Sequence, residues 1–257
     1  MSPLIVETIG HSAVITMNHP PANTWTLASL QLLRDTIDKL NQDRHIRALV
    51  ITGAGAKFFS AGADLNQFAA ADKGHAATVA AAFGAAFEML SAFRGVSIAA
   101  INGYAMGGGL EVALACDIRL AEEQAQLALP EASVGLLPCA GGTQNLTALV
   151  GEGWAKRMIL CGERLNAATA LTIGLVEEVV ATGTVLQHAL ALAAKVANQS
   201  PASVRACKQL IQSGRNMPRN QALPMERELF VALFDTEDQQ EGVKAFLEKR
   251  SAHWRNA

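Results

Sequence analysis

The sequence predicts an α/β fold built around a largely parallel sheet. Two continuous apolar runs of strand length, residues 47–53 (RALVITG) and 96–103 (VSIAAING), are typical of strands that are buried on both faces. A segment with apolar residues at helical spacing, residues 26–43, precedes the first run, and an alanine-rich segment around residues 76–93 precedes the second. Because strands that alternate with helices usually pair in parallel, these observations favour an α/β architecture.

The flanking elements follow from local signals. Residues 4–9 and 13–18 are typical of two short strands, and the Gly-His pair between them predicts a hairpin. Thr26 is placed to cap the helix that follows. From about Gly141 onward, segments with helical patterns are separated by glycine and proline, so we expect a helical layer in the last part of the chain.

Composition argues against several classes of function. The chain has 257 residues, 17% of them charged, and a formal net charge of −2, so no global field would recruit nucleic acid or an anionic membrane. No apolar run approaches the ~18 to 20 residues of a membrane span. The four cysteines have no CxxC pairing, no histidine at metal-ligand spacing and no apolar signal peptide before them. We therefore expect a soluble, cytoplasmic protein with reduced thiols.

Common nucleotide and hydrolase motifs are not found. Residues 51–59 (ITGAGAKFF) begin like a dinucleotide-binding loop, but Phe58 stands where the third glycine belongs. The glycine clusters lack the Gly-Lys-Ser/Thr of a phosphate loop, and the chain has neither a GxSxG nor an HExxH motif. The sequence therefore favours none of these chemistries.

Two glycine-containing loops remain, residues 58–65 (FFSAGADL) and 103–111 (GYAMGGGLE), and each follows a strand that is predicted to be buried. Ligands of α/β sheets gather beyond the carboxyl ends of strands, and glycine lets the backbone approach a ligand closely. If a helix begins at the triple glycine, its first N–H groups are unpaired and carry the positive end of the helix dipole. The pattern predicts an oxyanion receptor made of backbone, although close helix packing would also explain the glycines.

Two glutamates in apolar surroundings are the candidate acid–base groups. Glu111 lies three residues after Gly108, so its carboxylate would stand beside a ligand of the Gly108 N–H. Glu131 follows Pro130, which suits a turn. Two carboxyl groups near a dry site push their proton affinities apart, which lets one donate a proton while the other accepts. The alternative for Glu111 is a buried side chain that satisfies a neighbouring loop, and Glu131 alone is ambiguous.

Three motifs together closely resemble the crotonase, or enoyl-CoA hydratase/isomerase, family: residues 58–65, 101–117 (INGYAMGGGLEVALACD) and 127–146 (LALPEASVGLLPCAGGTQNL). The resemblance covers nearly the whole chain. It implies a ββα spiral core with a CoA-thioester site in residues 1–195, followed in residues 196–257 by a helical region used in trimer formation, commonly as a dimer of trimers.

The resemblance also implies roles for individual residues. The thioester carbonyl oxygen would be held by the backbone N–H groups of Ala63 and Gly108. Glu111 would position and deprotonate a water molecule for attack at Cβ, and Glu131 would deliver a proton to Cα. No metal or redox cofactor is implied, and CoA is part of the substrate. The residues assigned to substrate binding are Ala22, Ala61, Asp64, Leu65 and Asn66.

The leading interpretation is a 2-enoyl-CoA hydratase, since both glutamates are present, but related reactions stay open. Isomerases of this family that move a double bond from position 3 to position 2 need only the acid that matches Glu131. Some members of the family bind RNA through a lysine-rich helix, whereas the matching residues 30–47 mix acidic and basic side chains, which disfavours that function. A silent oligomeric scaffold would not need two glutamates in apolar surroundings.

The chain departs from the family pattern at four positions. Leu129, Cys139 and Asn145 stand where hydratases often have Gln, Gly and Arg, which affects pocket shape and loop support. Asn66 replaces a frequent lysine that contacts the CoA phosphates, which leaves Lys57 and the C-terminal Lys249 and Arg250 as other candidates for that contact. The acyl pocket is expected to involve the segment of residues 66–83 and helices of the neighbouring subunit. Phe68 and Phe83 are candidates for its lining, but packing in the core is the preferred interpretation of both.

Overall fold

The computed structural model describes residues 2–69 and 72–256. The chain forms two compact units, Met1–Ala193 and Ala194–Ala257. The first unit contains two sheets. The larger sheet consists, in spatial order, of β1 (Leu4–Ile9), β2 (Ser12–Met17), β3 (Ala48–Gly53), β5 (Val96–Ile101), β7 (Ile118–Glu122) and β10 (Glu178–Val180). The smaller sheet consists of β4 (Phe58–Ser60), β6 (Tyr104–Met106), β8 (Gln126–Ala128) and β9 (Leu165–Asn166).

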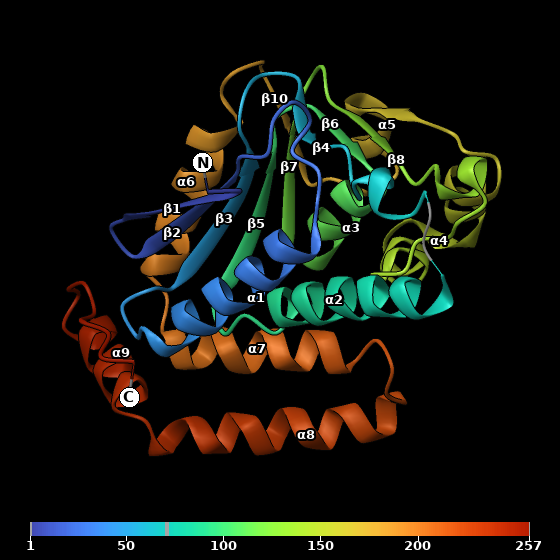
Figure 1. Cartoon of the computed structure of the whole chain (residues 1–257). Coiled ribbons are helices and arrows are strands. Elements are labelled where there is room, and N and C mark those ends of the chain that lie inside the picture. The colour runs from blue at the N-terminus through green and yellow to red at the C-terminus, as the bar shows by residue number, and fades with distance from the viewer. Residues whose placement is uncertain (1, 70–71, 257) are drawn as a thin grey trace. The chain divides into compact units, whose positions relative to one another are not determined.

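The helices of the first unit alternate with these strands, as Figure 1 shows. They are α1 (Leu27–Gln42), η1 (Leu65–Gln67), α2 (Lys73–Ser91), α3 (Gly108–Ala115), η2 (Glu131–Val134), α4 (Gly142–Leu160), α5 (Ala167–Thr172) and α6 (Val185–Ala197), the last of which continues into the second unit.

The core of the first unit is a spiral of ββα turns. In each turn the first strand joins the larger sheet, the second joins the smaller sheet, and a helix follows: β3, β4 and α2, then β5, β6 and α3, then β7, β8 and α4. Successive first strands pair in parallel, and so do successive second strands. The predicted α/β class and the ββα spiral are both confirmed.

Local signals in the sequence account for the first elements. β1 and β2 form the predicted antiparallel hairpin. Thr26 caps α1 in a capping box, because its side chain accepts from the Ser29 N–H while the Ser29 hydroxyl accepts from the Thr26 N–H. All six residues of β3 are buried, as its continuous apolar run predicts.

The region after Gly141 is mostly helical, as predicted, but it also contains two short strands that were not predicted. β9 and β10 lie in this region, and β10 pairs in parallel with β7 to complete one edge of the larger sheet. These strands are two and three residues long, so they are too short to show an alternating pattern in the sequence. α4 spans two segments that the sequence predicts as separate helices, and it is kinked between them at Gly151, whose φ is 77°.

The second unit is helical, with α7 (Pro201–Ser213), α8 (Arg219–Ala232), η3 (Leu233–Asp235) and α9 (Glu237–Leu247). Ser200 caps α7 and Pro201 occupies its first turn. Asp238 is buried, and its Oδ1 accepts hydrogen bonds from the backbone N–H groups of Arg255 (2.8 Å) and Asn256 (3.2 Å), which ties down the end of the chain.

Among the described residues, no helix combines the length and the apolar character needed to cross a membrane.

Candidate active site

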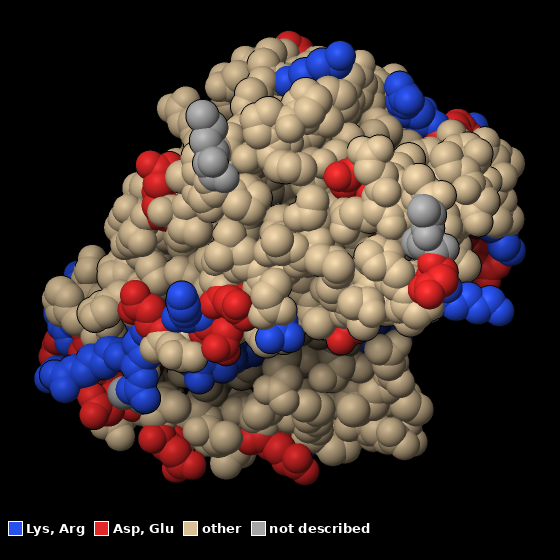
Figure 2. All heavy atoms as spheres, in the orientation of Figure 1, with Lys and Arg blue, Asp and Glu red and all other residues tan. Residues whose placement is uncertain are grey.

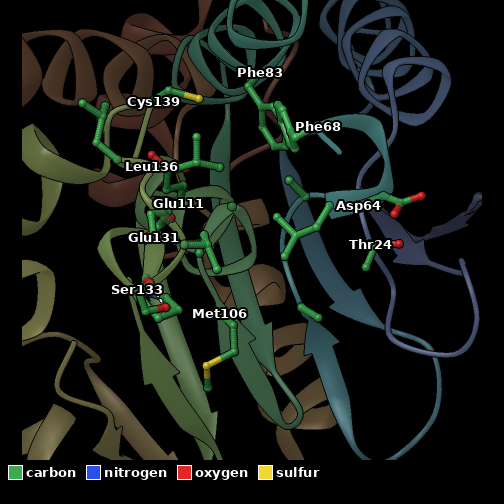
Figure 3. Close-up of a pocket in the computed structure, with 18 residues that line it drawn as sticks. Thr24, Asp64, Phe68, Phe83, Met106, Glu111, Glu131, Ser133, Leu136 and Cys139 are labelled. Carbon is green, nitrogen blue, oxygen red and sulfur yellow. Dashed lines mark hydrogen bonds between the residues drawn. The ribbon is translucent and has the colours of Figure 1, made fainter. Parts of the chain in front are cut away.

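Three strands of the smaller sheet end at one place in the first unit. β4, β6 and β8 run parallel, so their carboxyl ends lie at the same edge, where ligands of α/β sheets gather. Residues at or just after their ends, 61–65, 106–111 and 130–134, contribute to the lining of one cavity of about 380 Å³. Figure 3 shows Glu111 and Glu131 next to each other on one wall, with Phe68 and Phe83 across from them.

Gly107 and Gly108 leave room for two side chains of this cavity. Gly107 has a φ of 53°, which favours glycine, and a Cβ there would lie 3.1 Å from Oε1 of Glu131. A Cβ on Gly108 would lie 2.9 Å from the ring of Phe83. The two glycines thus let the backbone pass directly beneath an acidic and an aromatic side chain.

Gly109 serves helix packing. A Cβ at this position would overlap the backbone carbonyl oxygen of Ser60, at the end of β4. Only glycine therefore lets α3 lie this close to β4. Both explanations of the triple glycine apply, since Gly109 is needed for packing while Gly107 and Gly108 shape the cavity.

Two backbone N–H groups at the cavity are free to bind a ligand. Trp25 forms a parallel bridge with Ala63, in which the Trp25 N–H donates to Gly62 and the Asp64 N–H donates to Trp25. The Ala63 N–H therefore points to the opposite side. Gly108 is the first residue of α3, so its N–H has no partner within the helix. Neither N–H donates to another residue in the part of the chain that the structure describes.

Glu111 is held by the loop before α4. It is 3% exposed, and its Oε1 accepts hydrogen bonds from the backbone N–H groups of Ala140 (2.8 Å) and Gly142 (2.9 Å). Burial raises the pKa of Glu111, and these two hydrogen bonds oppose the rise. A Cβ on Gly142 would lie 2.8 Å from the same oxygen, so glycine is required for this contact. One carboxylate oxygen is thereby fixed, and the other is left for a ligand.

Glu131 has few partners. In the described residues neither of its carboxylate oxygens has a hydrogen bond of good geometry, although both are buried. Burial raises its pKa to about 7, its own backbone N–H opposes the rise, and the negative charge of Glu111 adds to it. A carboxyl group with a pKa near neutrality can both donate and accept a proton. The cavity thus combines two free N–H donors with two acids of unequal environment.

Most of the predicted site residues meet in this cavity. Those that line it are Ala61, Ala63, Asp64, Leu65, Gly108, Glu111 and Glu131. Ala22 and Asn66 are not among the lining residues. The Ala22 carbonyl accepts a hydrogen bond from the Ala61 N–H (2.9 Å), and the Asn66 side chain donates to Oδ1 of Asp64 (2.8 Å). Both support neighbours that do line the cavity.

The enoyl-CoA hydratase/isomerase family model matches residues 8–257. The chain belongs to this family. It is 42% identical to the 2,3-dehydroadipyl-CoA hydratase of Escherichia coli (strain K12), over 98% of each chain. The structure of Pseudomonas aeruginosa DspI covers 99% of this chain and 97% of its own, with 66% identity and a TM-score of 0.97. A Bacillus anthracis enoyl-CoA hydratase superposes over 100% of both chains, with 36% identity and a TM-score of 0.96.

Of the departures from the pattern of the enoyl-CoA hydratase/isomerase family, only Cys139 lines the cavity. Leu129 is fully buried, and Asn145 lies in the first turn of α4. Among the cations considered for CoA phosphates, Lys57 lies over the Phe58 ring at 5.3 Å. Arg250 is engaged by Glu241 (2.6 Å) and Glu248 (2.7 Å) in the second unit.

Part of the cavity wall consists of residues that were not predicted from the sequence to line it. Phe68 and Phe83, which were weighed as pocket or core residues, both line the cavity, and Phe83 is also buried. The rest of the apolar wall could have been suspected from the run of apolar residues after Glu131, because that segment is too rich in turns to form a strand. The lining residues not considered from the sequence are Thr24, Met106, Ser133, Val134, Leu136 and Leu137.

Because the pKa of Glu131 is raised, we predict that its replacement increases the stability of the fold in a pH-dependent way. The folded chain holds this proton more tightly than the unfolded chain, so stability is lost as the pH rises from about 4.5 to about 7. Glutamine does not ionise. We expect Glu131→Gln to have a higher unfolding midpoint than wild type at about pH 8 and a similar one at about pH 4. Calorimetry across this range tests the expectation, and a pH-independent difference contradicts it.

Cys139 is predicted to be an unreactive thiol. It is open to the cavity, yet desolvation by the surrounding atoms, followed by the charges of Glu111 and Glu131, raises its pKa to about 11. At about pH 8 we expect iodoacetamide to alkylate Cys139 at least ~10-fold more slowly than it alkylates the thiol of glutathione. Glu131→Gln should speed the alkylation of Cys139. Peptide mass spectrometry measures the rate. Labelling of Cys139 at the rate of the free thiol would show that the carboxyl groups do not govern it.

Proposed function

We propose that this chain is an enoyl-CoA hydratase, which reversibly adds water to a trans-2-enoyl-CoA thioester. The observation that carries the proposal is the pairing of Glu111 and Glu131 in one cavity with the unpaired N–H groups of Ala63 and Gly108. The names of the Escherichia coli and Bacillus anthracis relatives, both hydratases, support the same reaction.

The first task of the site is to stabilise charge on the thioester. The carbonyl oxygen would accept hydrogen bonds from the Ala63 and Gly108 N–H groups, which strengthen as the carbonyl becomes an enolate. The start of α3 adds the positive end of its dipole. Each such donor contributes roughly 3 to 4 kcal/mol to stabilising the transition state.

The two acids would divide the proton transfers. Glu111, with Oε1 held by Ala140 and Gly142, presents Oε2 to a water molecule and takes its proton as the water oxygen bonds to Cβ. The π electrons of the double bond move toward the thioester, and protonated Glu131 gives its proton to Cα. One water is added across the double bond, which leaves Glu111 protonated and Glu131 ionised. The starting state returns when the proton on Glu111 passes to Glu131, directly or through solvent.

A double-bond isomerase is the alternative reaction. It would shuttle a proton between two carbons through Glu131 alone, so it gives no reason for Glu111 to be buried and fixed by two N–H donors. The test is the loss of enoyl-thioester absorbance with crotonyl-CoA. Saturable loss supports the hydratase, whereas inactivity on 2-enoyl-CoA together with conversion of a 3-enoyl-CoA would identify an isomerase.

We also propose that the chain assembles as a homotrimer or homohexamer through its second unit. Large apolar side chains of α7, α8, η3 and α9 are exposed in the isolated chain, which favours burial against other subunits. They include Ile211, Phe230, Val231, Phe234, Phe246 and Leu247. Light scattering of the purified protein should give three or six chains, and a monomer would contradict this assembly.

The setting of the reaction follows from the same chemistry. Four free thiols fit a reducing compartment, so we place the enzyme in the cytoplasm. Fatty-acid β-oxidation is the pathway we propose, and amino-acid breakdown and aromatic degradation use the same reaction. Proton transfer and oxyanion binding require no metal or redox cofactor. RNA binding is disfavoured, since Arg34 of α1 is paired with Asp35 (3.7 Å) and acidic and basic side chains are intermixed on the face in Figure 2.

A further inference from the structure

Much of the cavity wall is apolar. It is formed by side chains from η1, from the segment just after it, from α2, from η2 and from the loop after η2. Figure 3 shows Phe68, Phe83 and Leu136 around the same space. These apolar lining residues are Leu65, Phe68, Phe83, Val134, Leu136 and Leu137.

Four of these side chains are exposed although they line a cavity. Leu65 is 52% exposed, Val134 54%, Leu136 43% and Leu137 67%. Apolar surface that lines a cavity is unfavourable to expose to water. Contact with an apolar ligand stabilises the complex by about 25 cal/mol for each Å² of this surface that the ligand covers. The wall is therefore suited to a hydrocarbon chain.

The charged groups of the cavity all have one sign. Its described lining residues include the acidic side chains Asp64, Glu111 and Glu131, and they include no lysine, arginine or histidine. An anionic group on the acyl chain would lose its water, find no cation on this lining and approach carboxyl groups. Such a group is repelled within a Debye length of ~8 to 10 Å, and less water in the cavity lengthens that range.

We propose that this cavity selects an uncharged, apolar acyl chain and rejects a chain that ends in a carboxylate. The inference rests on the proposed hydratase function and narrows its substrate class. It separates this chain from the Escherichia coli relative, whose name specifies 2,3-dehydroadipyl-CoA, the thioester of a dicarboxylic acid. In that substrate the terminal carboxylate lies only three bonds beyond Cβ, so it stays close to ionised Glu111 and to a described lining that includes no lysine, arginine or histidine.

A matched pair of substrates tests the selection. trans-2-Hexenoyl-CoA and 2,3-dehydroadipyl-CoA have the same six-carbon chain and double bond, and they differ in whether the chain ends in a methyl or a carboxylate. We expect kcat/KM of wild type to be at least ~100-fold lower for the dicarboxylic substrate, as for a buried charge left unpaired. Values within threefold of each other would overturn the proposal.

A cation placed in the wall should weaken the preference for the uncharged chain. Leu136→Arg supplies a partner for the terminal carboxylate, and Leu136→Gln is the matched polar but uncharged control. Leu136 is 43% exposed, so either side chain can be accommodated without opening the core. We expect Leu136→Arg to raise the ratio of dehydroadipyl-CoA to hexenoyl-CoA turnover at least ~10-fold over Leu136→Gln. An equal response to both variants would contradict the role of charge.

Binding separates this inference from the hydratase proposal. Hexanoyl-CoA and adipyl-CoA have no double bond, so their dissociation constants can be measured by calorimetry even if the protein hydrates nothing. We expect adipyl-CoA to bind at least ~10-fold more weakly, because its terminal carboxylate is desolvated without a partner. Equal affinities would refute the selection whatever the catalytic result, whereas weak adipyl-CoA binding without hydration would refute only the hydratase.

Discussion

Replacing Glu131 with glutamine is expected to lower kcat for crotonyl-CoA hydration at least ~1,000-fold, because the amide cannot deliver a proton to Cα. Glu111→Gln should cause a loss of similar size, since the amide cannot take a proton from water. Both replacements keep the size of the side chain. The dissociation constant of butyryl-CoA, a saturated analogue, should therefore change little.

The control for these variants is Glu88→Gln. Glu88 lies exposed on α2 and does not line the cavity, so its neutralisation removes one negative charge without touching the site. We expect Glu88→Gln to hydrate crotonyl-CoA at the wild-type rate. If Glu111→Gln or Glu131→Gln retains more than about a tenth of the wild-type kcat, that residue does not transfer the proton assigned to it.

Gly109→Ala is expected to damage both stability and catalysis. The new methyl group would meet the Ser60 carbonyl, and backbone atoms cannot move aside as a flexible side chain would. α3 must then separate from β4, which moves the Gly108 N–H relative to the Ala63 N–H. We expect a loss of about 3 kcal/mol in unfolding free energy and at least ~100-fold in kcat/KM.

Gly153→Ala is the matched control for this replacement. Gly153 also lies in a helix, α4, but a Cβ there would have no atom within 4 Å. Alanine should be neutral or stabilising by about 0.5 to 1 kcal/mol at such a position. Denaturant unfolding and crotonyl-CoA kinetics of the two variants provide the comparison. If Gly109→Ala is as stable and active as Gly153→Ala, close approach of α3 to β4 is not needed for the oxyanion site.

The local parts of the site could be predicted from sequence. The three-residue spacing between Gly108 and Glu111 is a property of one helix start, so a helix signal is enough to place the carboxyl group near the N–H. Glu131 was ambiguous alone. The resemblance assigned it a role, and the structure brings it beside Gly107 through the parallel pairing of β6 with β8.

Contacts between distant segments were beyond prediction. Nothing near Glu111 in the sequence indicates that Ala140 and Gly142, 29 and 31 residues later, donate to its carboxylate. The exposed Leu136 and Leu137 would ordinarily be read as poor candidates for a binding wall, because isolated apolar side chains are common on protein surfaces. Their importance appears only when the fold gathers them around one cavity.

The most direct test of the two-glutamate hydration traces the oxygen atom of the added water. trans-2-Hexenoyl-CoA is incubated with wild-type protein in water enriched in the heavy oxygen isotope, and the products are analysed by mass spectrometry. We expect 3-hydroxyhexanoyl-CoA that carries one heavy oxygen at C3, formed catalytically by wild type and not formed by Glu111→Gln. Recovery of substrate without any labelled 3-hydroxyhexanoyl-CoA, or formation of 3-hexenoyl-CoA without the isotope, would contradict the two-glutamate hydration.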